Sequence, residues 1–168
     1  TLRLLNSLFE LNLSPAERST YAAILGSDCA FFIHDKPMMG TGRGEILNEI
    51  SLDLKGKFLL LAKPNVHVST AEAYSTIKPK TPNRSIREIV TTSKVEDWKL
   101  LLKNDFEESV FKKHPAIAAL KEEMYLRGAI YASMSGSGAT VFGIFDKQPE
   151  VGLGFPDCVT WSGVLGSS

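Results

Sequence analysis

The sequence predicts an α+β fold in which helices pack against an antiparallel sheet. Apolar residues recur at helical spacing over residues 2–25 and again between residues 85 and 128. Short apolar runs bounded by Gly, Pro or Asn occur at 58–62, 130–134 and 139–145, which is typical of buried strands. The last strands follow one another closely, so antiparallel neighbours are expected at the C-terminal end.

Length and composition are those of one ordinary globular domain or of part of a larger one. The 168 residues carry 19 basic and 19 acidic side chains, so the net charge does not point to nucleic acid or to a membrane surface. The apolar runs are too short to span a bilayer, and we expect a cytoplasmic protein without a signal peptide. Because the chain starts at Thr1 inside a helical pattern, we expect it to be a piece of a longer protein.

Two helices are predicted at the start of the chain. Leucines and a phenylalanine between Leu2 and Leu11 repeat at helical spacing. Ser14 then serves as an N-cap, Pro15 occupies the first helical position, and Glu17 completes a capping box. The second helix runs to about Leu25.

A corner and a hairpin follow these helices. Gly26 can end the second helix with a positive φ, and the apolar run from Ala30 to Ile33 predicts a buried strand or strand start. Alternate glycines between Lys36 and Glu45 predict a tight hairpin or bulged strand rather than a phosphate-binding loop, because the spacing is not that of a dinucleotide fingerprint.

The remaining elements alternate between strands and short helices. A buried strand is predicted over Phe58–Ala62, and two further strands and a last one follow near the C-terminus. Helices are predicted between them, several opened by Ser, Asn or Pro. The predicted helices cover 70–77, 85–90, 95–102, 104–114 and 115–126, with Gly128 closing the last, and the later strands cover 130–134, 139–145 and 157–164.

Asp28 is the first candidate for chemistry. It lies between a glycine and an apolar run, at a corner between a helix and the next element. A carboxylate held at the edge of a packed interior can serve as a general base. The alternative is a turn residue whose side chain satisfies nearby backbone N–H groups.

The run Ser135-Gly136-Ser137-Gly138 is the second candidate. Its side chains are minimal, so backbone N–H groups and hydroxyls can approach a phosphate chain closely. A plain hairpin turn is the alternative, and no lysine follows the last glycine as it would in a Walker loop. The three histidines and two cysteines share no metal-ligand spacing, so no metal site is expected. Cys29 and Cys158 are expected to be buried free thiols.

Thr70 and Tyr74 share one face of a predicted helix, four residues apart. A hydroxyl and an aromatic ring so placed can hydrogen-bond to a base and stack on it, although a half-buried tyrosine with a solvated hydroxyl would give the same pattern. Between Lys55 and Arg87 there are seven basic residues against one acid, Glu72. This excess suits an anionic ligand, or simply a solvated basic face.

Three stretches together resemble one enzyme family. They are 25–32 followed by Gly42-Arg43-Gly44-Glu45, Asn83-Arg84-Ser85 with Asn104-Asp105-Phe106-Glu107, and 134–142. In this order they resemble the C-terminal part of the 4-diphosphocytidyl-2-C-methyl-D-erythritol kinases, which belong to the GHMP superfamily. The resemblance implies a ferredoxin-like antiparallel sheet packed with helices over 51–165, a preceding remnant of the N-terminal kinase domain over 1–50, and a tail at 166–168.

The same resemblance implies an activity and the roles of several residues. The reaction would be phosphorylation of a hydroxyl of the cytidine diphosphate-linked methylerythritol by ATP, with Mg²⁺, on the route to isoprenoid precursors. Asp28 matches the family's catalytic aspartate. Gly136, Ser137 and Gly138 match its third motif, beside the phosphates. Thr70 and Tyr74 fall where the family holds the cytidine end of the substrate.

One departure from the family is important. The family's glycine-rich ATP loop and catalytic lysine lie upstream of the matching region, so the resemblance implies that the missing N-terminal half is a partner and that these residues alone are inactive. Without that half, the first helix is expected to expose an apolar stripe. Another GHMP kinase of a small alcohol and a non-catalytic α+β ligand-binding module remain the alternatives.

Overall fold

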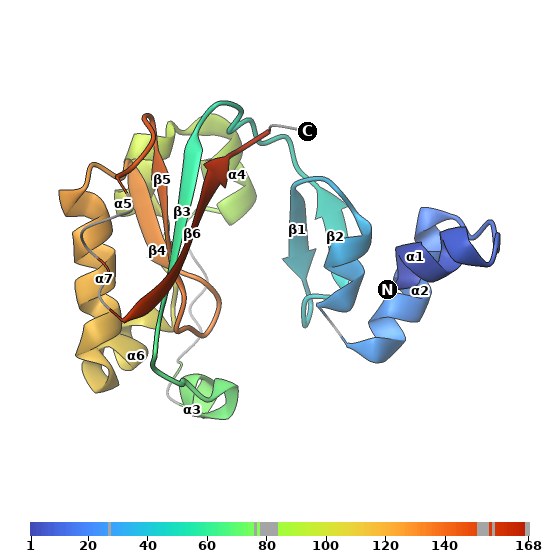
Figure 1. Ribbon diagram of the computed structural model, residues 1–168, viewed down its shortest axis with the longest axis horizontal. Coiled ribbons are helices and arrows are strands. Elements are labelled where there is room, and N and C mark those ends of the chain that lie inside the picture. The colour runs from blue at the N-terminus through green and yellow to red at the C-terminus, as the bar shows by residue number, and fades with distance from the viewer. Residues whose placement is uncertain (27, 76, 78–83, 151–154, 156, 167–168) are drawn as a thin grey trace. The chain divides into compact units, whose positions relative to one another are not determined.

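The computed structural model describes residues 1–26, 28–75, 77, 84–150, 155 and 157–166 (Figure 1). The chain divides into two compact units, Thr1–Leu52 and Asp53–Ser168. This boundary lies two residues from the predicted one at residue 50. The origin of the first unit in an N-terminal kinase domain stays a prediction, and the tail residues 167–168 lie outside the described residues.

The first unit consists of short helices and one hairpin. Its elements are α1 (Leu2–Leu8), α2 (Pro15–Leu25), the 3₁₀-helix η1 (Cys29–Ile33), β1 (Met38–Thr41) and β2 (Ile46–Glu49). The predicted capping box is confirmed, because Glu17 N–H donates to Ser14 Oγ and the Glu17 carboxylate accepts from Ser14 N–H. The predicted hairpin is also confirmed, since β1 and β2 pair antiparallel. Helix α1 ends earlier than predicted, before Glu10 and Asn12, which both have a positive φ.

Two predictions at the corner between α2 and the hairpin are wrong. Residues Ala30 to Ile33 form a 3₁₀-helix and not a strand, because Phe31 N–H donates to Asp28 O and His34 N–H donates to Phe31 O. The spacing of three between Ala30 and Ile33 places both on one side of such a helix, where they pack with Ala22. Gly26 does end α2, but with an extended backbone (φ 169°) rather than a positive φ in the left-handed region.

The second unit is built on a four-stranded antiparallel sheet with the order β4-β5-β3-β6. The strands are β3 (Phe58–Pro64), β4 (Tyr131–Met134), β5 (Val141–Phe145) and β6 (Cys158–Val164). This order is that of a ferredoxin-like sheet, so the fold prediction is confirmed. Among the described residues that connect β5 to β6 no helix is formed, whereas the connection from β3 to β4 contains all the helices described in this unit.

Helices fill the connection from β3 to β4. They are α3 (Thr70–Ser75), α4 (Ile86–Thr92), the 3₁₀-helix η2 (Val95–Asp97), α5 (Trp98–Leu101), α6 (Glu107–Lys113) and α7 (Pro115–Leu126). Helix α7 runs alongside the sheet and packs on β3, β4 and β5 (Figure 1). The predicted helix over 70–77 is described only as far as Ser75, because residue 76 lies outside the described part of the chain.

The core of the second unit lies between α7 and one face of the sheet. Its largest fully buried side chains are Leu60, Ile117, Met124, Met134 and Val141. Each such side chain contributes about 1.5–3 kcal/mol when it is removed from water. On the opposite face of β4, Tyr131 packs edge-on against Trp98 of α5, with ring centroids 5.6 Å apart. The sheet and its helices therefore hold the ends of β4 and β5, and the loop that joins them, in a fixed place.

Candidate functional site

Asp28 lies at the start of η1, with backbone angles in the right-handed helical region. Asp28 is exposed, and within the described part of the chain its side chain makes no hydrogen bond that caps the 3₁₀-helix. The alternative of a turn residue that satisfies its own helix therefore has no support in this geometry. The carboxylate is free to accept a proton or a hydrogen bond from a ligand.

The hairpin turn closely approaches this carboxylate. A methyl group added at Gly44 would lie 2.8 Å from Asp28 Oδ1, which is closer than real Cβ contacts come. Gly44 also has a φ of 106°, which side chains rarely adopt. Asp28 and Gly44 line a shallow depression together with apolar neighbours, namely Phe31, Phe32, Gly40 and Leu47. The carboxylate thus faces a small, largely apolar space.

The turn is itself held by Glu45. The Glu45 carboxylate accepts the Arg43 N–H at 2.7 Å, and a methyl group at Gly42 would lie 3.0 Å from Glu45 Oε1. Hydrogen bonds from its own backbone and from that of Arg43 hold the pKa of Glu45 below its ordinary value. These contacts give the run from Gly42 to Glu45 a physical role: Glu45 fixes the turn and Gly44 lies against Asp28.

Arg3 anchors the other end of η1. Its guanidinium donates to the carbonyl oxygens of Phe32 and Ile33 at 3.1 and 2.8 Å, and to Asp35 Oδ2 at 2.6 Å. The hydrogen bond from Arg3 lowers the pKa of Asp35. Because free carbonyl groups at a helix end need donors, Arg3 stabilises the short helix that carries Asp28.

The loop Ser135-Gly136-Ser137-Gly138 joins β4 to β5 in the second unit. Ser135 N–H donates to Thr140 O at 2.8 Å, and Gly138 N–H donates to Ser135 O at 3.0 Å. Gly136 and Gly138 both have a positive φ. Within the part of the chain that the structure describes, the N–H groups of Gly136 and Ser137 find no acceptor. Free N–H groups on a loop of small residues suit an anionic ligand such as phosphate.

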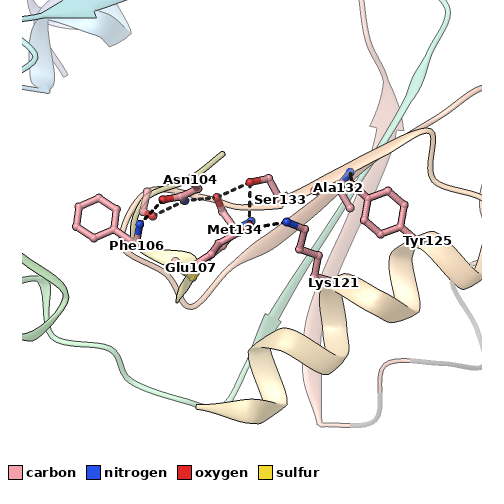
Figure 2. A network of polar contacts seen from close by, with 9 residues as sticks. Asn104, Phe106, Glu107, Lys121, Tyr125, Ala132, Ser133 and Met134 are labelled. Atoms are coloured by element: carbon pink, nitrogen blue, oxygen red, sulfur yellow. Dashed lines mark hydrogen bonds and ion pairs between the residues drawn. The ribbon is translucent and has the colours of Figure 1, made fainter. Parts of the chain in front are cut away.

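Asn104 lies ahead of α6, and Glu107 is the first residue of that helix. Both side chains contact the backbone at the base of this loop (Figure 2). Asn104 Nδ2 donates to Met134 O at 2.8 Å and to Gly136 O at 2.9 Å. Glu107 Oε1 accepts the Met134 N–H at 2.8 Å and the Ser133 hydroxyl at 3.0 Å. The other Glu107 oxygen accepts from Lys121 Nζ at 2.6 Å.

Thr70 and Tyr74 are both exposed on α3. The ring of Tyr74 packs edge-on against Phe106, with centroids 4.9 Å apart. Helix α3 is also tied to α6 by an ion pair of 3.0 Å between Glu72 and Lys113, which lowers the pKa of Glu72. The exposed ring of Tyr74 keeps one side available to a ligand.

The second unit therefore brings several of the predicted residues together. Tyr74 contacts Phe106, whose N–H donates to Asn104 Oδ1, and Asn104 in turn contacts Gly136. Gly138 lies beside the residue Val68, which precedes α3. Asp28 belongs to the first unit, where the hairpin turn and η1 surround it.

Sequence reasoning assigned no role to Asn104 and Glu107, although it noted the stretch that contains them. The spacing Asn-x-x-Glu before an apolar helix is typical of a capping box. Here the N-cap is Phe106, and the Glu107 carboxylate contacts β4 instead of its own helix. Glu107 is only 8% exposed. This burial marks its role, and burial is visible only in the fold.

Comparison with known proteins identifies the domain. Residues 86–152 match the family model described as GHMP kinases C terminal, a region that includes the Asn104–Glu107 stretch and the Ser135–Gly138 loop. This chain carries a GHMP kinase C-terminal domain. The resemblance seen in the sequence is thereby confirmed.

Two relatives of this chain carry the same name. The chain is 49% identical over 150 residues to the 4-diphosphocytidyl-2-C-methyl-D-erythritol kinase of Bacteroides fragilis, which covers 89% of the chain and 54% of the relative. It is 44% identical over 167 residues to the enzyme so named from Parabacteroides distasonis, covering 98% of the chain and 61% of the relative. The chain thus spans little more than half the length of the curated relatives it matches.

Solved structures show the same fold at lower identity. A crystal structure of 4-(cytidine 5'-diphospho)-2C-methyl-D-erythritol kinase matches with a TM-score of 0.64 and 23% identity, over 84% of this chain and 51% of that one. Homoserine kinase from Cytophaga hutchinsonii matches with a TM-score of 0.63 and 14% identity, over 86% and 52%. The fold of the GHMP kinases is shared by both.

Several further observations bear on the predicted sites. Within the described ranges, no three His, Cys, Asp or Glu side chains gather as they would around a metal ion. None of the described helices is both long enough and apolar enough to cross a bilayer. Both cysteines are free, but Cys29 is exposed and Cys158 is only partly buried, so the prediction that both are buried is wrong. In the basic segment, Lys57 pairs with Asp146 and Arg84 with Glu88, while Lys78 and Lys80 lie outside the described residues.

Helix α1, the residues that follow it and the end of α2 leave apolar side chains in solvent. Leu4 and Leu8 are each 67% exposed, and Phe9, Leu11 and Ile24 are exposed as well. The predicted apolar stripe on the first helix is therefore confirmed. Apolar side chains that are exposed together in this way are typical of a surface that another segment covers.

Proposed function

We propose that this chain is the C-terminal part of a kinase that transfers phosphate from ATP to a hydroxyl of 4-diphosphocytidyl-2-C-methyl-D-erythritol. The observation that carries the proposal is the similarity over nearly the whole chain to enzymes named for that substrate, at 44–49% identity. The product would enter the synthesis of isoprenoid precursors. We also propose a cytoplasmic location, where ATP is available to the enzyme.

In this proposal Asp28 acts as the general base. The substrate hydroxyl gives its proton to the Asp28 carboxylate as its oxygen forms a bond to the γ-phosphorus of ATP, and the bond from that phosphorus to the β-phosphate oxygen breaks to release ADP. The free carboxylate beside Gly44 supports this role. Mg²⁺ would accompany ATP as part of the co-substrate.

The second unit would hold the nucleotide groups. The free N–H groups of Gly136 and Ser137 and the hydroxyl of Ser137 are suited to phosphate oxygens, and Gly138 allows the backbone to approach closely. Thr70 and Tyr74 would bind the cytidine end, the first by its hydroxyl and the second by stacking.

The partner in this proposal is the N-terminal half that the relatives have and this chain does not match. The apolar side chains of α1 and α2 support such a partner, because it would cover them. We expect the 168 residues alone to show no ATP-dependent transfer, since positioning of the transferred phosphate needs more than one loop.

The alternative of another GHMP kinase has one supporting observation. Homoserine kinase matches the fold with nearly the same TM-score as the diphosphocytidyl-methylerythritol kinase. The sequence favours the latter substrate, because the relatives at 44–49% identity carry its name. A non-catalytic ligand-binding module would leave the free carboxylate of Asp28 without a purpose.

A chimera tests the proposal directly. This chain replaces the matching segment of the Parabacteroides distasonis enzyme, and phosphate transfer from ATP is measured with diphosphocytidyl-methylerythritol and, separately, with homoserine. Transfer to the first alcohol alone supports the proposal. Transfer to homoserine alone supports the alternative kinase. A chimera that unfolds cooperatively on heating, yet transfers phosphate to neither alcohol, overturns both and leaves the binding module.

A further inference from the structure

We propose that Asn104 and Glu107 are positioning residues that hold the Ser135–Gly138 loop in its phosphate-receiving shape, an inference that rests on the function proposed above. Neither residue lies in the loop: Asn104 contacts Gly136 of the loop and the end of β4, and Glu107 contacts the end of β4 (Figure 2). Together they bind both backbone groups of Met134, its N–H and its C=O, at the end of β4. The loop therefore starts from a fixed backbone position.

Asn104 supplies the donors of this arrangement. One amide nitrogen donates to two carbonyl oxygens, Met134 O at 2.8 Å and Gly136 O at 2.9 Å. The first belongs to the strand and the second to the loop, so the side chain joins them. Its oxygen accepts the Phe106 N–H at 3.0 Å, which fixes the orientation of the amide. Since Asn104 holds the carbonyl groups of Met134 and Gly136, the N–H groups of Gly136 and Ser137 remain for a ligand.

Glu107 supplies the acceptors. Oε1 receives the Met134 N–H and the Ser133 hydroxyl, and Oε2 receives Lys121 Nζ. A buried carboxylate is costly unless it is paired and hydrogen-bonded, and here Glu107 pairs with Lys121 of α7 and accepts hydrogen bonds from β4. The helix that carries Glu107 makes no use of the carboxylate. The position of the Glu107 carboxylate is explained by the hydrogen bonds that it accepts at the end of β4.

The substitution Asn104→Asp tests the inference sharply. An aspartate still accepts the Phe106 N–H, so the start of α6 keeps its hydrogen bond. It cannot donate to Met134 O or Gly136 O, so both loop contacts are lost. Asn65→Asp is the matched control, because Asn65 is exposed in the same unit and the change in charge is identical. Glu107→Gln is the companion variant, because it keeps the shape of the side chain and removes its charge.

The first readout is amide hydrogen exchange in the 168-residue chain, followed by NMR. Exchange at Ser135 and Gly138 should rise about tenfold in Asn104→Asp, and exchange at Met134 should rise in Glu107→Gln. The Leu60 amide in β3 should not change in either variant. Unchanged exchange at Ser135 and Gly138 overturns the inference. An equal rise at Leu60 also overturns it, because the substitution would then have loosened the whole sheet.

The second readout is kinetic and uses the chimera described above. In Asn104→Asp the KM for ATP should rise about tenfold, while the KM for the alcohol stays as in the Asn65→Asp control. A rise in both KM values would contradict a specific role at the phosphates. Faster exchange in the loop of a chimera that transfers no phosphate supports the positioning of the loop and counts against the kinase function itself.

Discussion

Gly44 lies so close to Asp28 that a methyl group at position 44 would come within 2.8 Å of Asp28 Oδ1. The hairpin turn thereby limits where the carboxylate can point. A general base must lie within hydrogen-bond reach of the proton it removes, so a displacement of about 1 Å can cost on the order of 100-fold in rate. The glycine is needed both for the space and for its φ of 106°.

The substitution Gly44→Ala should therefore lower kcat of the active chimera by about 10- to 100-fold, with little change in either KM. Gly56→Ala is the control for the backbone, because Gly56 also has a positive φ but would meet no atom within 4 Å. Both variants should lose a similar amount of stability, about 1–2 kcal/mol. Equal kcat values in the two variants would show that the turn does not position Asp28.

Asp28→Asn tests the base itself. The amide keeps the size of the side chain but cannot take a proton, so kcat of the chimera should fall by a factor of about 100 to 10,000. Asp97→Asn, at an exposed aspartate in η2, removes the same charge and should leave the rate unchanged. If Asp28→Asn retains full activity, Asp28 is not the base, although the kinase function could still hold.

The corner that carries Asp28 shows what the sequence could and could not predict. The two helices and the hairpin followed from capping residues and glycine spacing, which are local signals. Four apolar residues in a row fit a strand or a short helix equally well, and contacts with Ala22 favoured the 3₁₀-helix. The approach of Gly44 to Asp28 is tertiary, so no local pattern could reveal it.

The same limit explains the omission of Glu107. The strands of the second unit were predictable because each is a short apolar run. The pairing of β4 with β5 and of β5 with β3 determines which residues end beside the loop, and that pairing joins distant parts of the chain. A glutamate at the start of a helix is usually solvated, so its burial against Met134 depends wholly on this pairing.

Burial of Tyr131 predicts how stability depends on pH. Removal from water raises the pKa of its phenol above the value of about 10 for an unfolded chain. Below pH 10 both states keep the proton and the full stability is present. As the pH rises further, the unfolded chain loses its proton first, so the free energy of unfolding falls until the pKa of the folded state is passed.

Urea unfolding between pH 9 and pH 11 measures this effect, and Tyr131→Phe should make the fall less steep. Tyr21→Phe serves as the control, because Tyr21 is 51% exposed. If the wild type and Tyr131→Phe lose stability in parallel, the ionisation of Tyr131 is not responsible, and other groups cause the decline.

The two cysteines should differ in their reaction with an alkylating reagent. Burial raises the pKa of Cys158, so little of its thiol is ionised at pH 8, and access to it is partial. Cys29 is exposed beside Asp28, and its thiol is open to solvent. Because the thiolate is the reacting form, iodoacetamide should modify Cys29 about tenfold faster than Cys158. Cys29→Ser and Cys158→Ser variants leave one thiol each, so that mass spectrometry follows each rate alone. Equal rates would mean that Cys158 is as open to the reagent as Cys29, which would contradict its partial burial at the start of β6.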